Sequence, residues 1–260
     1  VCNYIPAKTR QSILSEAFIR QSYNPGETCE FDWGEVKLKI NGRLTKLQLA
    51  VFTSAYSNHR YAFIYNRQDT LSFMDAHVRY FSAIGGVYHL MVYDNMRVAV
   101  AKFVGLHEKE PTKALLELRG YYGFSHRFCN TYRANEKGHV ERSVEYVRRK
   151  AFALKDSFDS VETAQRWLIQ VLDKLNHAKQ KTVGKSATEL IEEEKKVLGV
   201  LPAAPLVCAE QKQLRVDKYA TVSYRTNRYS VSDDLVGKFV DVFIYADDLK
   251  IFYQSTQVAT

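Results

Sequence analysis

The sequence predicts an α/β fold, in which helices flank a mixed sheet, followed by a small all-β domain. Two alternating apolar runs meet at Asn41-Gly42, the strongest short-range signal for a β-hairpin. A third strand, a helix and a buried strand type follow in that order, as in an α/β sheet. From 206 to 260, short alternating runs are separated by turn residues, a pattern typical of a small antiparallel barrel.

The first strand is expected at Thr28–Ile40 and contains C-E-F-D-W-G-E. Successive strand residues point to opposite faces, so Asp32 is expected to face away from Phe31 and Trp33. The other expected strands are Leu44–Phe52, Tyr61–Tyr65, a buried strand ending in Asp94-Asn95, and Ser125–Phe128. The expected helices are Ser12–Ser22, Thr70–Ile84, 110–123, Asn135 or Glu136 to about Leu154, Ser160 to about Asn176, and one opened by the capping box Ser186–Glu189.

Composition narrows the class of protein. Apolar residues make up 46% and charged residues 25%, which is ordinary for a soluble globular chain. No apolar run reaches about 18 residues, so no membrane span is expected. The net charge of +8 favours a polyanion partner. The four cysteines lie far apart and form no zinc spacing, which fits a reducing cytosol. The first residue is not Met, so the chain is expected to be a fragment.

Three acidic residues stand out: Asp32, Asp94 and Glu141. The order of elements could bring each to one end of the sheet. Converging carboxylates repel one another unless cations neutralise them, and oxygen-only ligands favour Mg²⁺ or Mn²⁺. Two such ions about 3.5–4 Å apart can hold the attacking and leaving oxygens of a phosphodiester. Taken alone, an acidic residue in the position of Asp32 is more often a structural carboxylate, and one in the position of Asp94 is more often part of an Asx-turn.

The residues around these acids resemble a known family. E-F-D-W-G, V-Y-D-N-M-R and N-E-K-G-H-V-E-R-S-V resemble the acidic motifs of DDE transposases and retroviral-type integrases, in particular the IstA-type transposases of bacterial insertion sequences. The final stretch, Y-R-T-N-R-Y-S-V and L-V-G-K-F-V-D-V, is similar to the small barrel that follows the catalytic domain in these enzymes and in phage Mu transposase. Within the third motif Glu141 is favoured over Glu136, which could be a helix-start residue, and Glu145 is expected to be solvated or ion-paired.

The resemblance implies a ribonuclease H-like domain with Asp32, Asp94 and Glu141 as catalytic residues and ligands of two Mg²⁺ or Mn²⁺ ions. It implies cleavage at transposon ends and transfer of the 3′-hydroxyl ends into target DNA, without a covalent protein intermediate. It also implies a homo-oligomer on paired ends, an AAA+ ATPase helper and a cytoplasmic bacterial location. Helix-turn-helix domains that precede the catalytic domain in the family are not expected within this chain.

With this resemblance, four parts are expected along the chain: an N-terminal segment and linker at 1–26, a ribonuclease H-like catalytic domain at 27–158, a helical extension and linker at 159–205, and a small β-barrel at 206–260. Several residues near the acids or in the barrel are candidate DNA contacts, with solvated or loop positions as the alternative for each. They are Asn95, Arg97, Lys137, His139, Arg142, Arg148, Arg149, Arg225 and Arg228.

Two other functions remain open on the sequence. A simple metal-dependent nuclease of the same fold would hydrolyse nucleic acid without joining it. A non-catalytic DNA-binding or assembly module derived from a transposase is the alternative outside enzymes. The three acids argue against that module, because a scaffold has no physical need for converging carboxylates.

Overall fold

A computed structural model of the protein describes residues 22–94, 96–104, 108–129 and 140–260. The helix expected at 12–22 lies outside these ranges except for its last residue, as does the expected start of the helix at 135–154. Within the described residues, no helix is both long enough and apolar enough to cross a membrane.

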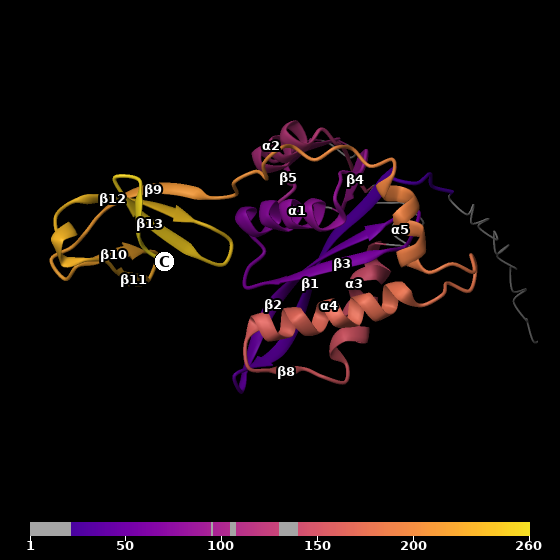
Figure 1. The fold of residues 1–260 in the computed structure, drawn as a ribbon, viewed down its shortest axis with the longest axis horizontal. Helices are drawn as coiled ribbons and strands as arrows, with labels where there is room; N and C mark the ends of the chain where they lie inside the picture. The colour runs from indigo at the N-terminus through magenta and orange to yellow at the C-terminus, as the bar shows by residue number, and fades with distance from the viewer. Residues whose placement is uncertain (1–21, 95, 105–107, 130–139) are drawn as a thin grey trace, which may run out of the picture.

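A mixed sheet forms the centre of the larger part (Figure 1). Its strand order is β3-β2-β1-β4-β7, and β8 joins β1 beside this path. The first three strands are antiparallel, whereas β4 and β7 run parallel to β1. The predicted mixed sheet is therefore confirmed. Its strands are β1 (Thr28–Ile40), β2 (Arg43–Ser54), β3 (Arg60–Tyr65), β4 (Leu90–Tyr93), β7 (Ser125–Phe128) and β8 (Ser157–Phe158).

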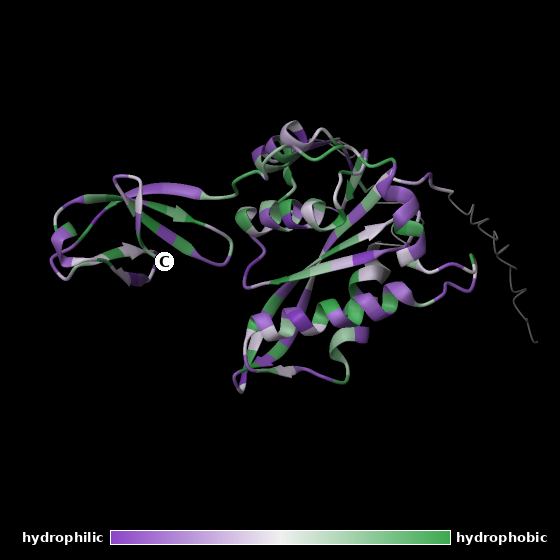
Figure 2. Cartoon of the chain, viewed as in Figure 1, coloured by the Kyte–Doolittle hydropathy of each residue, from purple (hydrophilic) through white to green (hydrophobic). Residues whose placement is uncertain are grey.

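Helices cover both faces of this sheet (Figure 1). On one face α1 (Thr70–Ile84) and α2 (Lys113–Tyr122) share a core with Phe31 and Phe52. On the other face α3 (Val140–Phe152) and α4 (Val161–His177) share a core with Leu38. The hydropathy colouring shows apolar stretches along the strands between the two helical layers (Figure 2). Alternation along β1 thus assigns its residues to two separate cores.

The helices begin and end where side chains satisfy the free backbone groups. Asp69 accepts a hydrogen bond from Ser72 N at the start of α1, and Gly85 ends α1 in the left-handed conformation. Thr112 caps α2 in the same way. Ser186 and Glu189 form the predicted capping box at the start of α5 (Ala187–Lys195). The capping box at Ser186 and Glu189 is the one expected from the sequence.

Five of the strands that the structure describes were missed by the sequence analysis. The hairpin of β5 (Val100–Val104) and β6 (Glu108–Pro111) follows β4, and β8 has only two residues, too few to show a period. In the last part, β9 (Glu210–Arg215) and β14 (Thr256–Ala259) were also missed. The run E-Q-K-Q-L-R of β9 is almost wholly polar, and most of its residues are exposed, so it lacks the apolar alternation of a half-buried strand.

The C-terminal part is a small all-β domain, as expected (Figure 1, left). One antiparallel sheet has the order β14-β13-β12-β9, and a separate hairpin pairs β10 with β11. Both sheets contribute to one core, in which Val222 and Ile251 are buried. The strand pairs within 206–260 do not close into a complete barrel. The remaining elements are β10 (Thr221–Tyr224), β11 (Asn227–Ser230), the 3₁₀ turn Asp233–Leu235, β12 (Phe239–Ile244) and β13 (Leu249–Tyr253).

A buried carboxylate ties α5 to the central sheet. Glu194 is completely inaccessible to solvent, and its oxygens accept hydrogen bonds from Ser54 Oγ at 2.6 Å, Ser57 Oγ at 2.9 Å and Tyr88 Oη at 2.9 Å. Three hydroxyl donors compensate much of the cost of burying this charge. The helical extension is thereby fixed to the turn after β2 and to the segment before β4.

We expect Glu194→Ala to lower the free energy of unfolding by about 3 kcal/mol, because three buried hydroxyls lose their acceptor. Denaturant unfolding of the purified protein measures this change. Glu192→Ala is the control: Glu192 lies two residues earlier, is exposed and forms an ion pair with Lys195, whose Nζ lies 2.7 Å from its Oε1. We expect its effect to stay within about 0.5 kcal/mol. Equal effects of the two substitutions would contradict a role of Glu194 in holding α5.

Candidate active site

Asp32 and Asp94 lie at neighbouring positions in the sheet. β1 and β4 are parallel, and Phe31 pairs with Tyr93. Asp32 directly follows Phe31 and Asp94 directly follows Tyr93. Because neighbouring strands lie about 4.8 Å apart, the two acids are next to each other along the chain direction of both strands. Neither Asp is fully buried. The Asp32 carboxylate accepts a hydrogen bond from Trp33 N at 2.8 Å. Two of the three predicted acids therefore occupy neighbouring backbone positions where β4 ends.

The first turn of α3 lies over the same face of β1. Ser143 Oγ is 2.8 Å from Thr53 Oγ1 and accepts a hydrogen bond from Arg60 Nε at 3.1 Å. Thr53 pairs across the sheet with Glu30. Ser143 is thus anchored close to the start of β1, and the backbone of α3 at Glu141 lies one turn or less from this anchor. The side chain of Glu141 lies outside the described part of the chain.

A glycine allows α3 to come this close. Gly34 lies two residues after Asp32, on the same face, and a Cβ built on it would overlap Val144 Cγ1. Val144 is buried in the core that α3 shares with the sheet. Farther along the helix, Arg148 Nη1 donates a hydrogen bond to Glu35 O at 3.3 Å. These contacts fix where α3 crosses the strand that carries Asp32.

The residues before the two aspartates pack on a buried histidine. The His77 ring lies 4.6 Å from the Phe31 ring, between centroids, and its Nε2 is 3.0 Å from Tyr93 Oη. Its Nδ1 is 2.7 Å from Phe73 O. Burial lowers the pKa of His77 to about 3, so the ring is neutral, donates from Nδ1 to Phe73 and accepts from Tyr93. A rigid aromatic layer thus supports both strands on the face opposite the acids.

A fourth carboxyl, Glu30, was missed by the sequence analysis. It is 6% exposed and lies on the Asp32 face, two residues earlier in β1. Burial raises the pKa of Glu30 to about 7; Arg127 on β7 lowers it and the Asp32 charge raises it further. The signal in the sequence was its spacing of two from Asp32, which places both side chains on one face.

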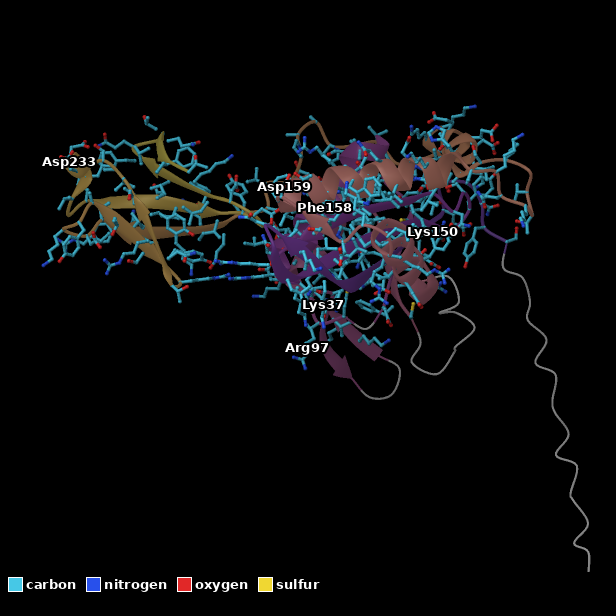
Figure 3. The ribbon with its side chains drawn as sticks, turned by 90° about the horizontal axis from the view of Figure 1, so that it is seen from below. Lys37, Arg97, Lys150, Phe158, Asp159 and Asp233 are labelled. Atoms are coloured by element: carbon cyan, nitrogen blue, oxygen red, sulfur yellow. The ribbon has the colours of Figure 1, made fainter. Side chains whose placement is uncertain are left out.

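The candidate DNA contacts of the larger part are only partly described. Arg97 is exposed in the turn after β4, and Arg148 and Arg149 are exposed on α3. Lys150, labelled in Figure 3, is exposed on the same helix, and its Nζ lies 5.8 Å from the centre of the Tyr146 ring. Four candidates cannot be placed, because Asn95, Lys137 and His139 lie outside the described residues, as does the side chain of Arg142.

Arg225 and Arg228 lie on the β10–β11 hairpin, away from the aspartate pair in the chain. Arg225 is at the turn with a φ of 53°, and its guanidinium lies 5.3 Å from the centre of the Tyr224 ring. A cavity of about 520 Å³ separates this turn from the segment that leads into α1, and both Arg67 and Arg225 line it. Arg228 is exposed on β11. The structure therefore places Arg225, together with Arg67, at the domain junction.

The donor set fits a hard divalent cation. Asp32 and Asp94 offer carboxylate oxygens from rigid, adjacent positions, and such oxygens are the ligands that Mg²⁺ and Mn²⁺ prefer. Among the side chains that the structure describes, no three His, Cys, Asp or Glu groups come together. Glu141, the third acid predicted from the sequence, is in the first turn of α3.

Comparison with known proteins agrees with this architecture. Residues 201–260 match the family model of the Mu transposase C-terminal domain. The chain is 30% identical over 264 residues to the transposase for insertion sequence element IS21 of Pseudomonas aeruginosa, covering 99% of this chain and 66% of that protein. The chain belongs to the IS21-type family of insertion-sequence transposases.

Other relatives are about twice as long as the part that this chain matches. The transposase for insertion sequences IS1326/IS1353 of Shigella flexneri is 29% identical over 243 residues, which cover 93% of this chain and 48% of that protein. The chain thus spans about half the length of the curated relatives it matches. A chain of the simian T-cell lymphotropic virus intasome, solved with the PP2A regulatory subunit B56 gamma, shares the fold at a TM-score of 0.53 and 13% identity, covering 93% of this chain and 82% of that chain.

Proposed function

We propose that this chain is the catalytic part of a DNA transposase that cleaves at transposon ends and transfers the 3′-hydroxyl ends into target DNA. The observation that carries the proposal is the parallel pairing of Phe31 with Tyr93, which makes Asp32 and Asp94 the next residues on adjacent strands, while the first turn of α3 contacts the Asp32 face of the sheet at Thr53. The family membership supports the DNA substrate, and the net charge of +8 is complementary to it.

In this proposal Asp32, Asp94 and Glu141 are the catalytic carboxylates. The Asp32 carboxylate is held by Trp33 N, so one of its oxygens is oriented before any ligand binds. The Phe31, Tyr93 and His77 layer fixes the strand positions that precede both aspartates. Preorganised groups of this kind pay little reorganisation cost in the transition state. Glu141 would complete the set from α3, whose first turn Ser143 anchors.

Two Mg²⁺ or Mn²⁺ ions bound by these carboxylates would stabilise the attacking and leaving oxygens of an in-line phosphoryl transfer. The chain itself supplies three functions: rigid placement of the carboxylates, charge that neutralises the ions, and basic residues that hold the DNA backbone. Of the candidate DNA contacts, Arg97, Arg148 and Arg149 are exposed in the catalytic part. A homo-oligomer on paired ends and an AAA+ ATPase helper belong to this proposal, since both follow from the family resemblance.

The decisive experiment is strand transfer of a pre-cleaved, labelled transposon-end duplex into plasmid DNA by the full-length protein with Mg²⁺ or Mn²⁺. We expect joined product from the wild type and none in EDTA. We expect Asp94→Asn to reduce joining by about 10³-fold, because loss of one ligand carboxylate removes roughly 4 kcal/mol of transition-state stabilisation.

Asp173→Asn is a matched control, since Asp173 is an exposed aspartate on α4 far along the chain from the pair. It should join DNA at the wild-type rate. Nicking without joining by the wild type would favour a nuclease of the same fold. Binding and oligomerisation without nicking or joining, in the presence of the helper, would favour a non-catalytic assembly module.

A further inference from the structure

A two-stranded ribbon extends beyond the rest of the central sheet. β3 pairs with β2 only as far as Gln48, and β4 pairs with β1 only as far as Phe31. Residues 36–40 and 43–47 therefore pair with each other beyond the ends of β3 and β4. Only the short β8 pairs with this part of the sheet as well, at Lys39 and Ile40. We call these two segments the overhanging ribbon. It continues β1 directly from the aspartate pair.

The two faces of the overhanging ribbon differ sharply. Val36, Leu38 and Leu47 are buried against α3, α4 and β8, which anchors the ribbon to the core. The opposite face belongs to the same side of the sheet as α1, but its side chains are exposed. Lys37 and Lys39 from β1 and Leu44 and Lys46 from β2 form this face. A rigid strand pair thus presents three lysines to solvent.

Two of these lysines directly oppose each other. Lys37 is the cross-strand partner of Lys46. Like charges in this position destabilise an antiparallel pair, so the arrangement reduces folding stability slightly. One carboxylate offsets it: Glu35 lies 2.5 Å from Lys46 Nζ, and both groups are partly exposed. A polyanion lying across the ribbon would relieve this repulsion, which gives the surface a charge complementary to a phosphate backbone.

The ribbon is a direct extension of the strand that carries Asp32. Lys37 lies five residues beyond Asp32 on the same strand, about 17 Å along it, and its side chain is on the α1 side of the sheet, opposite the face of Asp32. This distance corresponds to about five base-pair steps of a duplex. Lys37 and Arg97 both lie toward the lower edge of the catalytic domain as viewed in Figure 3. Backbone contacts several base pairs from the reacting phosphate fix the register of a duplex without reading its sequence.

We propose that the lysine face of the overhanging ribbon, Lys37, Lys39 and Lys46, binds the phosphate backbone of duplex DNA flanking the reacting phosphodiester. The inference rests on the proposed transposase function for its occupant. It assigns the contact to a sheet surface outside the motif that contains the acids.

The test compares binding of a labelled duplex of about 40 base pairs, about four helical turns, by the full-length protein over a series of salt concentrations. The test variant carries the three substitutions Lys37→Gln, Lys39→Gln and Lys46→Gln. We expect it to bind DNA more weakly and the slope of log K against log salt concentration to become less steep by about 2 to 3, since each lost phosphate contact reduces the slope by about 0.9. Thermal melting should be unchanged or slightly raised, because all three side chains are exposed.

Lys174→Gln/Lys181→Gln/Lys196→Gln is the matched control, since it removes the same charge from exposed positions on and beyond α4 and α5. Its slope should stay near that of the wild type. The proposal is overturned if the ribbon variant keeps the wild-type slope, as it would if the ribbon bound an acidic protein, or if both variants change it equally. Joining by the wild type with an unchanged ribbon slope would reject this surface while leaving the transposase function intact. A reduced slope for the ribbon variant, with no joining by the wild type, would support this DNA-binding surface and contradict the transposase function.

Discussion

Glu141→Gln should abolish strand transfer, with a loss of about 10³-fold or roughly 4 kcal/mol of transition-state stabilisation. The expected effect equals that of the aspartates, because all three carboxylates would share the charge of the bound cations. The structural reason is the place of α3: Ser143 and Val144, two and three residues after Glu141, contact the face of the sheet that carries Asp32. Joining of a pre-cleaved duplex measures the loss.

The same helix and the segment before it offer two comparisons for Glu141. Glu145 is one turn later and exposed, and we expect Glu145→Gln to retain wild-type joining. Glu136 precedes α3 and lies outside the described residues; we expect Glu136→Gln to lower joining much less than Glu141→Gln does. The reverse order of these two effects would reassign the third carboxylate to Glu136, whereas equal activity of all three variants would remove α3 from the site.

The second large effect concerns a residue without any functional group. We expect Gly34→Ala to reduce joining by about 10²-fold, because the added methyl group would overlap Val144 and displace α3 from the strand that carries Asp32. Val144 cannot easily turn away, since a β-branched side chain in a helix has one preferred rotamer. Overpacking should also lower the free energy of unfolding by about 1–3 kcal/mol.

A double substitution separates this mechanism from general damage. Gly34→Ala combined with Val144→Ala removes the overlapping methyl groups, so joining should recover to within about tenfold of Val144→Ala alone. The measurement is the full cycle of four proteins, with both joining and denaturant unfolding. If the pair loses as much activity as the sum of the single variants, the close approach of α3 is not what Gly34 provides.

Local sequence patterns predicted most of the central fold. Alternation in β1, the Asn41-Gly42 turn, and the caps at Asp69, Thr112 and Ser186 all depend on residues close in the chain, and the structure contains each of them. The C-terminal domain was recognised by the same kind of pattern. The strands that were missed are polar or very short, because their stability comes from partners that the local sequence does not reveal.

The site shows the same division. The sequence by itself determined the candidate acids, their chemistry and the family, since these depend on residue types and motifs. Only the tertiary structure decided that Asp32 and Asp94 follow the paired residues Phe31 and Tyr93, that Gly34 lies under Val144, and that Glu30 is buried with a raised pKa. It also separated the bare lysine face of the overhanging ribbon from its buried face. The physical reason is that register, close approach and desolvation arise between segments far apart in the chain, where no local propensity acts.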